Sequence, residues 1–262
     1  MALNQKTVLA LAERLENAEL QRSDIVKITD EFPDMDWEDA YAIQYAIRKR
    51  KLDRGSKLVG LKMGLTSFAK IRQMGVEEPI FGFLVSDYVR QDGGAIEFDQ
   101  LIHPKVEAEI AFVLRSPLSG PGCHVGDVLA ATDFIVPAVE IIDSRYRDFK
   151  FDLKSVVADN CSSARFVTGG HARKPQDLDL RNMGIVLEKN GEVIATAAGA
   201  AVLGHPAASV AMLANMLGKR GEHIPAGTFV MTGGVTEAYA VERGDSITAR
   251  FQDIGSVSMR FT

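Results

Sequence analysis

The feature that most restricts the fold of this chain is a change in hydrophobic period near residue 57. Before it, apolar residues recur every three or four positions, which is typical of amphipathic helices. After it, short apolar runs of period two alternate with glycine and proline, which is typical of strands. The sequence therefore predicts an α+β chain with an N-terminal helical cap (residues 1–56) and a β-rich catalytic body (residues 57–262), together one compact unit.

Local patterns predict individual elements. An apolar stripe over residues 6–20 predicts a first helix, and Asp36 is a suitable N-cap for a second. Asn190 and Gly191 stand between two short apolar runs; both tolerate positive φ, so they predict a tight hairpin. A further helix is predicted over Pro206–Gly218, because a proline in the first turn precedes another apolar stripe.

Composition excludes several classes of protein. The 262 residues include 30 Lys and Arg against 35 Asp and Glu, a formal net charge of -5. This is an ordinary globular composition, and a chain of this length can bury a sizeable core. The mildly acidic balance, without a dense basic block, argues against nucleic acid or an anionic membrane as the main partner.

The sequence also predicts neither a membrane span nor secretion. The most apolar stretch, Ile194–Leu217, is interrupted by polar residues and by Pro206. The first residues show no continuous hydrophobic region of the kind a signal peptide has. The two cysteines form no C-x-x-C motif, so a disulfide framework or structural zinc is not expected. We expect a cytoplasmic protein.

Three glutamates are the strongest candidates for a metal site. Glu107 and Glu109 alternate along an apolar strand, so they share one face at about 7 Å between Cα atoms. Glu140 lies in a second strand that is equally apolar. Buried like charges repel unless a cation or shared proton compensates them, and carboxylates without nearby His or Cys suit Mg²⁺ or Mn²⁺. Spacing alone leaves an alternative open, in which the pair lines a solvated face and Glu140 pairs with an arginine.

Lys62 is the second candidate. It lies in a glycine-flanked apolar strand, where an ammonium group must either reach solvent or meet an anion. The order of its glycines does not match a phosphate loop, which excludes that kind of nucleotide site. The polar segment Asp143–Asp148 follows Glu140 and is compatible with a lid, a layer behind the site or a solvated loop.

Other chemistries lack a signature. The histidines form neither H-x-H nor H-E-x-x-H, and no G-x-S-x-G motif occurs. Adjacent glutamates on one face also match a glycosidase poorly, since its two carboxylates flank the sugar from opposite sides.

Several segments together resemble the fumarylacetoacetate hydrolase superfamily, and most closely its hydratase/decarboxylase branch from the meta-cleavage pathway of aromatic catabolism. They are Gly60–Ser67, Pro104–Ile110, Glu140–Arg145, Val157–Asn160, Ala197–Gly204 and Gly244–Ile247. The resemblance covers nearly the whole chain. It implies a mixed β-roll or barrel body and a homo-oligomer. It also implies that Glu107, Glu109 and Glu140 hold Mg²⁺ or Mn²⁺, with Lys62 as the catalytic residue beside the substrate.

Two reactions occur in that branch. One is decarboxylation of the dicarboxylate 2-oxo acid 4-oxalocrotonate (2-oxohex-3-enedioate) to 2-hydroxypenta-2,4-dienoate and CO₂; the other is hydration of that product. In the segment Glu78–Phe83, hydratases of the branch carry an acidic residue where this chain has Ile80. An apolar residue there would exclude water and destabilise a carboxylate about to leave as CO₂. We therefore expect the decarboxylase, with the hydratase as the alternative.

Remaining expectations concern contacts and partners. Ser162, Gly233 and Gly234 are candidate substrate-binding residues, although turn or packing roles explain them equally well. The product is unstable and is the hydratase's substrate, so a complex with a homologous vinylpyruvate hydratase is expected. Another alternative is a structural partner subunit of that hydratase, against which the intact glutamates and Lys62 argue. A hydrolase of the acylpyruvate type would need a His-Glu arrangement that we do not find.

Overall fold

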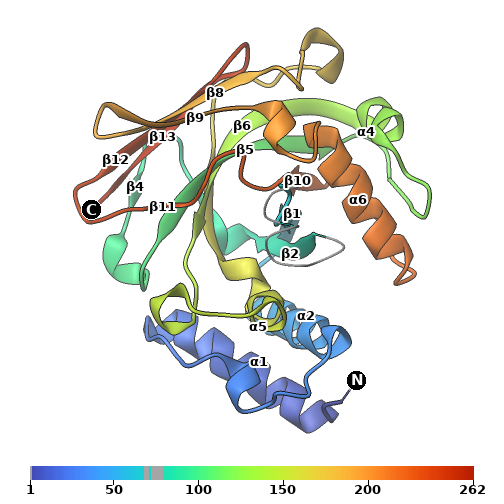
Figure 1. Ribbon diagram of the computed structural model, residues 1–262, viewed down its shortest axis with the longest axis vertical. Helices are drawn as coiled ribbons and strands as arrows, with labels where there is room; N and C mark the ends of the chain where they lie inside the picture. The colour runs from blue at the N-terminus through green and yellow to red at the C-terminus, as the bar shows by residue number, and fades with distance from the viewer. Residues whose placement is uncertain (1, 68–70, 72–78) are drawn as a thin grey trace.

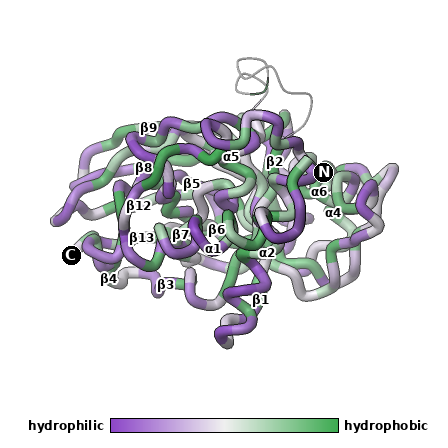
Figure 2. The backbone as a smooth tube through the Cα atoms, turned by 90° about the horizontal axis from the view of Figure 1, so that it is seen from below, coloured by the Kyte–Doolittle hydropathy of each residue, from purple (hydrophilic) through white to green (hydrophobic). Residues whose placement is uncertain are grey.

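The fold combines two sheets with a separate layer of helices (Figure 1). The computed structural model describes residues 2–67, 71 and 79–262, so Glu78 of the Glu78–Phe83 motif lies outside the described residues. Hydrophobic and hydrophilic residues alternate along many segments of the chain (Figure 2). The α+β class predicted from the sequence is confirmed.

The helical layer is built from α1 (Gln5–Gln21) and α2 (Trp37–Asp53), which pack against each other. The predicted N-cap is confirmed: the Asp36 carboxylate accepts the N–H of Asp39 at 2.8 Å, and Asp39 accepts the N–H of Asp36 in return. The short helix α5 (Leu153–Ala158) packs on α2, so a segment from the body joins this layer (Figure 1).

The larger sheet carries the candidate site. Its strand order is β2-β1-β10-β5-β6-β7-β3, and β11 also pairs with β5. The long strands β5 and β6 lie antiparallel at its centre, and most of their residues are buried. The strand bounds are β1 Leu58–Gly64, β2 Ile80–Val85, β3 Val89–Arg90, β5 Lys105–Leu114, β6 Thr132–Ile142, β7 Ser163–Thr168, β10 Phe229–Met231 and β11 Tyr239–Ala240.

The smaller sheet has the order β4-β13-β12-β8-β9. Asn190 and Gly191 join β8 to β9 with φ values of 56° and 83°, which confirms the predicted hairpin. The strand bounds are β4 Ala95–Ile96, β8 Gly184–Lys189, β9 Glu192–Ala198, β12 Ser246–Phe251 and β13 Gly255–Phe261.

Two further helices, α4 (Val125–Ala131) and α6 (Pro206–Gly218), pack against each other beside the larger sheet. The bounds of α6 match the prediction. By length and composition alone, the stretch Gly199–Gly218 could cross a membrane, but 61% of its most apolar window is buried, as in a core helix. Single turns of 3₁₀ helix are η1 Ile28–Asp30, η2 Ser86–Tyr88, η3 Phe98–Gln100, η4 Arg147–Phe149, η5 Asn160–Ser162, η6 Pro175–Asp177 and η7 Gly199–Ala201.

Candidate active site

Strand register brings the three predicted glutamates together. Glu107 on β5 lies directly opposite Glu140 on β6, and Glu109 follows on the same face of β5. One carboxylate oxygen from each of the three lies within 4.8 Å of the other two. Glu109 and Glu140 are completely buried, and Glu107 is half-buried. The alternative in which the glutamates line a solvated face is therefore wrong.

These carboxylates lack enough hydrogen-bond donors for their degree of burial. Glu109 Oε2 accepts the N–H of Gly233 at 2.7 Å, but Glu109 Oε1 and Glu140 Oε1 accept no hydrogen bond from the described residues. Burial raises the pKa of Glu109 well above its usual value, and the charge of Glu140 raises it further. Unsatisfied buried carboxylate oxygens are costly, and a bound cation would remove that cost. The donor set consists of oxygen atoms and suits Mg²⁺ or Mn²⁺.

Lys62 supplies a positive charge beside this cluster. Its buried Nζ lies 2.7 Å from Glu140 Oε2 and donates to the carbonyl of Cys161 at 3.4 Å. Burial alone would lower the pKa of Lys62, but the negative charges of Glu140 and the neighbouring acidic groups together outweigh it, so the pKa is raised and the ammonium form persists. Lys62 therefore meets an anion, and the alternative of a lysine reaching solvent is wrong.

A cavity of about 330 Å³ opens beside these residues. The polar residues that line it include Lys62, Thr66, Glu107 and Ser162, and Gly234 lines it as well. The apolar part of its lining consists of Leu65, Ile80, Ile142, Phe151, Leu153 and Val156. The cavity is large enough for a small dicarboxylate, and its lining combines charged and hydroxyl groups with apolar side chains. Ile80 lies in this wall as predicted, whereas the residues from α5 were not anticipated.

The predicted glycines lie next to the carboxylates. Gly233 has φ 92°, and a Cβ there would come 2.1 Å from Thr66 Oγ1. A Cβ on Gly234 would come 2.9 Å from the Cδ of Glu107. Both positions therefore need glycine for close packing, and the Gly233 amide orients Glu109. Contact of either glycine with substrate stays a prediction.

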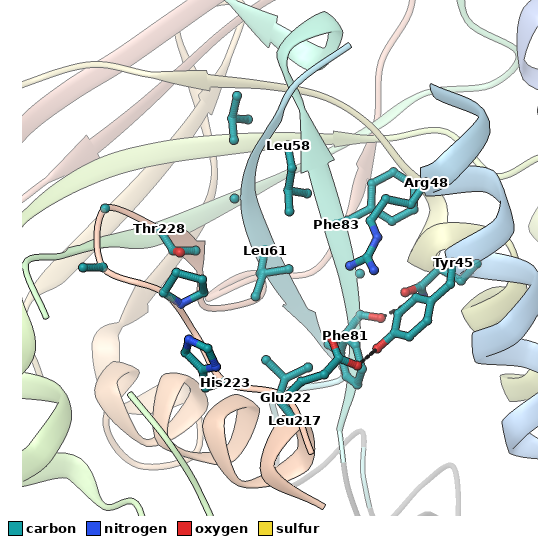
Figure 3. A pocket seen from close by; sticks show the side chains of 17 residues that line it. Tyr45, Arg48, Leu58, Leu61, Phe81, Phe83, Leu217, Glu222, His223 and Thr228 are labelled. Atoms are coloured by element: carbon teal, nitrogen blue, oxygen red, sulfur yellow. Dashed lines mark hydrogen bonds between the residues drawn. The ribbon is translucent and has the colours of Figure 1, made fainter. Parts of the chain in front are cut away.

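A second cavity, of about 390 Å³, lies on the other face of β1. Leu61 lines it, whereas the next residue, Lys62, lines the cavity with the carboxylates, because side chains alternate along a strand. Figure 3 shows Tyr45 directed at Glu222, to which its hydroxyl donates at 2.8 Å. Arg48 lies 4.4 Å from the Tyr45 ring centroid. These polar groups contact one another, so we place the active site in the first cavity.

The segment after β6 is buried behind the site. Ser144, Arg145 and Tyr146 are at most 2% exposed, so a solvated loop is wrong for this part of Asp143–Asp148. Arg145 forms a buried ion pair with Asp159, which sequence reasoning missed. The available signal was Asp159 itself, an acidic residue directly after the apolar run Val156–Ala158.

The family can be decided at this point. The family model "Fumarylacetoacetate (FAA) hydrolase C-terminal" matches residues 66–262. The chain belongs to the fumarylacetoacetate hydrolase family. The predicted membership is confirmed, and with it the fold expected of this family.

Three members of the fumarylacetoacetate hydrolase family place the chain more closely. A 4-oxalocrotonate decarboxylase of Pseudomonas putida is 63% identical over 259 residues, which cover 99% of this chain and 98% of that relative. The structure of 4-oxalocrotonate decarboxylase from Pseudomonas putida G7, complexed with magnesium and adipate, matches with a TM-score of 0.98 and 61% identity, covering 100% of this chain and 99% of the other. A 2-hydroxypent-2,4-dienoate hydratase of Pseudomonas putida is 40% identical over 220 residues, covering 84% of this chain and 99% of its own. The comparisons thus favour the decarboxylase over the hydratase.

Proposed function

We propose that this protein is a Mg²⁺-dependent lyase that converts 4-oxalocrotonate to 2-hydroxypenta-2,4-dienoate and CO₂. The observation that carries the proposal is a single cavity that is lined both by the charged groups Lys62 and Glu107 and by apolar side chains such as Ile80. The charged groups suit the 2-oxo acid group of the substrate, and the apolar side chains suit a carboxylate that leaves as a neutral molecule. The high identity to 4-oxalocrotonate decarboxylases supports the same conclusion.

The cation fits the residues present. Glu107, Glu109 and Glu140 offer oxygen ligands within a few ångströms of one another, and two of their buried oxygens accept no hydrogen bond from the described residues. When bound, Mg²⁺ or Mn²⁺ would supply a Lewis acid for the negative charge that develops on the keto oxygen. Gly233 holds Glu109 in place through its backbone N–H.

Lys62 is the proposed catalytic residue. Because it stays protonated and desolvated beside Glu140, its Nζ can donate to an anionic oxygen of the substrate. As the bond to the distal carboxylate breaks, the electron pair moves through the carbon–carbon double bond to the keto oxygen. A fixed ammonium group at that end stabilises this charge with little reorganisation. Ser162 lines the same cavity and can donate from its hydroxyl.

The apolar wall favours loss of CO₂. Ile80, Phe151 and Val156 offer the distal carboxylate no hydrogen bond from their side chains, so its charged ground state is poorly solvated there. The transition state spreads this charge towards Lys62 and is therefore less affected. An acidic residue at position 80 would instead bring water into this part of the cavity.

We extend the proposal to the surroundings of the enzyme. We expect a cytoplasmic homo-oligomer, with which the two free thiols, Cys123 and Cys161, are compatible. The product is unstable and is the substrate of hydratases in the same branch. A complex with a homologous vinylpyruvate hydratase would pass it on before it decays.

The test is incubation of the purified protein with 4-oxalocrotonate and Mg²⁺, with and without a chelator, while CO₂ and the absorbance of the dienol are followed. We expect release of CO₂ that the chelator abolishes and Mg²⁺ restores. Glu107→Gln, which keeps the size of the side chain, should lower kcat/KM by about 100-fold or more.

The alternatives give different results in the same assay. Consumption of added 2-hydroxypenta-2,4-dienoate without release of CO₂ from 4-oxalocrotonate would identify a hydratase. Absence of both reactions, in protein that is folded and loaded with Mg²⁺, would support the structural partner subunit.

A further inference from the structure

The backbone beside the proposed active site adopts an unusual conformation. Asn160, Cys161 and Ser162 have φ values of 50°, 52° and 60°. Three consecutive residues with side chains are thus left-handed, a conformation that L-residues rarely adopt even singly. Such a turn persists only where its surroundings determine it strongly.

This left-handed turn presents two groups to the site. The Cys161 carbonyl accepts from Lys62 Nζ at 3.4 Å. Ser162 lines the cavity, and its buried Oγ has no hydrogen-bond partner among the described residues. A buried hydroxyl without a partner beside a cavity points to a ligand that would supply the partner.

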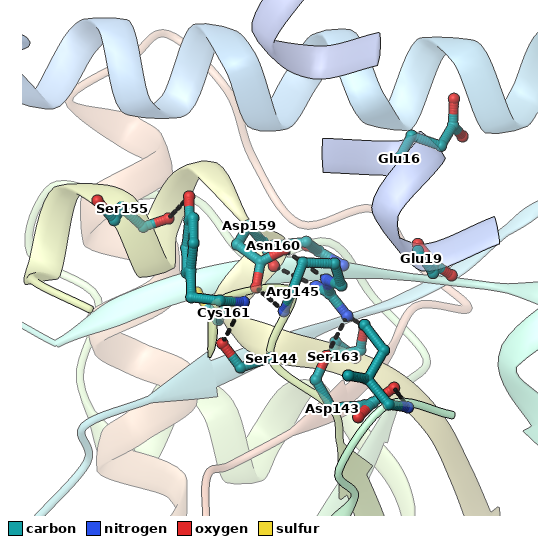
Figure 4. A network of polar contacts seen from close by, with 12 residues as sticks. Glu16, Glu19, Asp143, Ser144, Arg145, Ser155, Asp159, Asn160, Cys161 and Ser163 are labelled. Atoms are coloured by element: carbon teal, nitrogen blue, oxygen red, sulfur yellow. Dashed lines mark hydrogen bonds and ion pairs between the residues drawn. The ribbon is translucent and has the colours of Figure 1, made fainter. Parts of the chain in front are cut away.

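Arg145 binds the chain on both sides of the turn (Figure 4). Nη2 donates to the Asp159 carbonyl, directly before the turn, and Nη1 donates to the Ser163 carbonyl, directly after it, at 3.1 Å. Nη1 also donates at 2.7 Å to the carbonyl of Asp143, which follows β6. The planar guanidinium is required for this arrangement, since its donors point in fixed directions.

The charge of Arg145 is balanced locally. Its Nε pairs with Asp159 Oδ1, and its backbone N–H donates to Asp159 Oδ2 at 3.1 Å. Both side chains are almost completely buried. The remaining N–H groups of Arg145 therefore donate to backbone carbonyls rather than to a second carboxylate.

We propose that Arg145 is a positioning residue, which fixes the carbonyls on both sides of the left-handed turn and thereby directs the Ser162 hydroxyl at the substrate beside Lys62. This inference rests on the proposed function, because it requires the substrate to occupy the cavity. Arg145 itself does not touch the substrate.

The experiment is a double-variant cycle on kcat/KM for CO₂ release, with Ser162→Ala, Arg145→Lys and the combined variant. Lysine keeps the positive charge against Asp159 but cannot bind all three carbonyls. We expect kcat/KM to fall by about 10- to 100-fold in each single variant, because a small misplacement of a binding group lowers the rate by this much. The combined variant should be no worse than Ser162→Ala alone, since Arg145 acts through Ser162.

Two controls separate positioning from stability. Ser163→Ala removes the neighbouring hydroxyl, which is also buried and has no hydrogen-bond partner in the described part of the chain, but which is not among the residues that line the cavity. It should lower kcat/KM much less than Ser162→Ala does. Arg250→Lys alters an exposed arginine on β12, which pairs with Glu188 on β8, and should leave kcat/KM within about 2-fold of wild type.

Several results would overturn the inference. One is a combined variant whose fold-loss in kcat/KM is the product of the losses in the two single variants. The others are wild-type kcat/KM in Arg145→Lys and wild-type kcat/KM in Ser162→Ala. The Ser162→Ala result can be measured even if Arg145→Lys does not fold. If wild type releases no CO₂, the proposed function fails separately. The same variants are then compared by the Kd of adipate in the presence of Mg²⁺. Free-energy losses in adipate binding that add in the combined variant, or absence of adipate binding, would refute the role of Arg145.

Discussion

At the scale of the residue, our proposal assigns to Ile80 the choice between two reactions that use the same charged groups. Ile80 is 4% exposed and lies in the apolar wall of the cavity. Its Cγ1 would lie 3.1 Å from a Cβ at Gly64, so the side chain packs closely against β1. Under the proposed function, Ile80 limits the water that reaches the distal carboxylate of the substrate, while Lys62 and the glutamates bind its 2-oxo acid group.

Ile80→Asp tests this assignment. We expect its kcat for CO₂ release to fall by about 10- to 100-fold, because a carboxylate and its water would solvate the charged ground state and repel the substrate. Ile80→Val is the matched control and should remain within a few-fold of wild type. The measurement is CO₂ release at saturating Mg²⁺, together with consumption of 2-hydroxypenta-2,4-dienoate. Equal activity of the two variants would contradict a role for apolarity here.

Some residues of the candidate site could be predicted from their neighbours in the sequence, and others could not. Glu107, Glu109 and Lys62 could be proposed from the sequence because a charge in an apolar strand is conspicuous within a few residues. Their meeting with Glu140 depends on the register between β5 and β6, which no local pattern encodes. The pairing of Arg145 with Asp159 was not predictable for the same reason, since a loop and a helix lie between them.

At the scale of the element, one buried glutamate ties the two cap helices together. Glu16 on α1 is 1% exposed and faces the last turns of α2, where Arg50 Nε lies 2.6 Å from Glu16 Oε2. Arg54 and Lys51 approach its other oxygen. Burial alone would raise the pKa of Glu16, but the hydrogen bonds from Arg54 and Arg50 outweigh burial and lower it.

This pKa shift predicts how stability depends on pH. A carboxyl group with a lowered folded-state pKa stabilises the fold above its ordinary pKa of 4.5, and that contribution is lost as the pH falls through the folded-state value. Glu16→Gln should therefore lower the free energy of unfolding by about 1–3 kcal/mol at pH 7. In urea titrations, the difference in the free energy of unfolding between wild type and Glu16→Gln should become smaller below about pH 4.5. The control is Glu13→Gln, at an exposed and longer contact with Arg50, which should change the free energy of unfolding little. A difference between Glu16→Gln and wild type that does not depend on pH would contradict the assignment.

At the scale of the whole molecule, the cap and the body share an interface that hydrophobic periods alone did not reveal. The stripes of α1 and α2 and the hairpin at Asn190 were predictable because their signals are local. The position of β10 between β1 and β5 was not, since it joins distant segments. The helix α5 is too short to show a stripe, yet it packs on α2 and leads into the left-handed turn of the site.

We propose from this continuity that the cap and the body unfold as one unit, and a metal ion provides the test. The chain's one tryptophan, Trp37, begins α2 in the cap, whereas the glutamates lie in the body. Mg²⁺ at 100 times its Kd should raise the free energy of unfolding by about 2.7 kcal/mol. In urea, the fluorescence of Trp37 and the far-ultraviolet signal of the sheets should shift together with Mg²⁺, and Glu109→Gln should abolish both shifts. If the urea midpoint of the Trp37 fluorescence does not change with Mg²⁺ while that of the sheet signal does, the cap and the body unfold as two separate units that meet near residue 57.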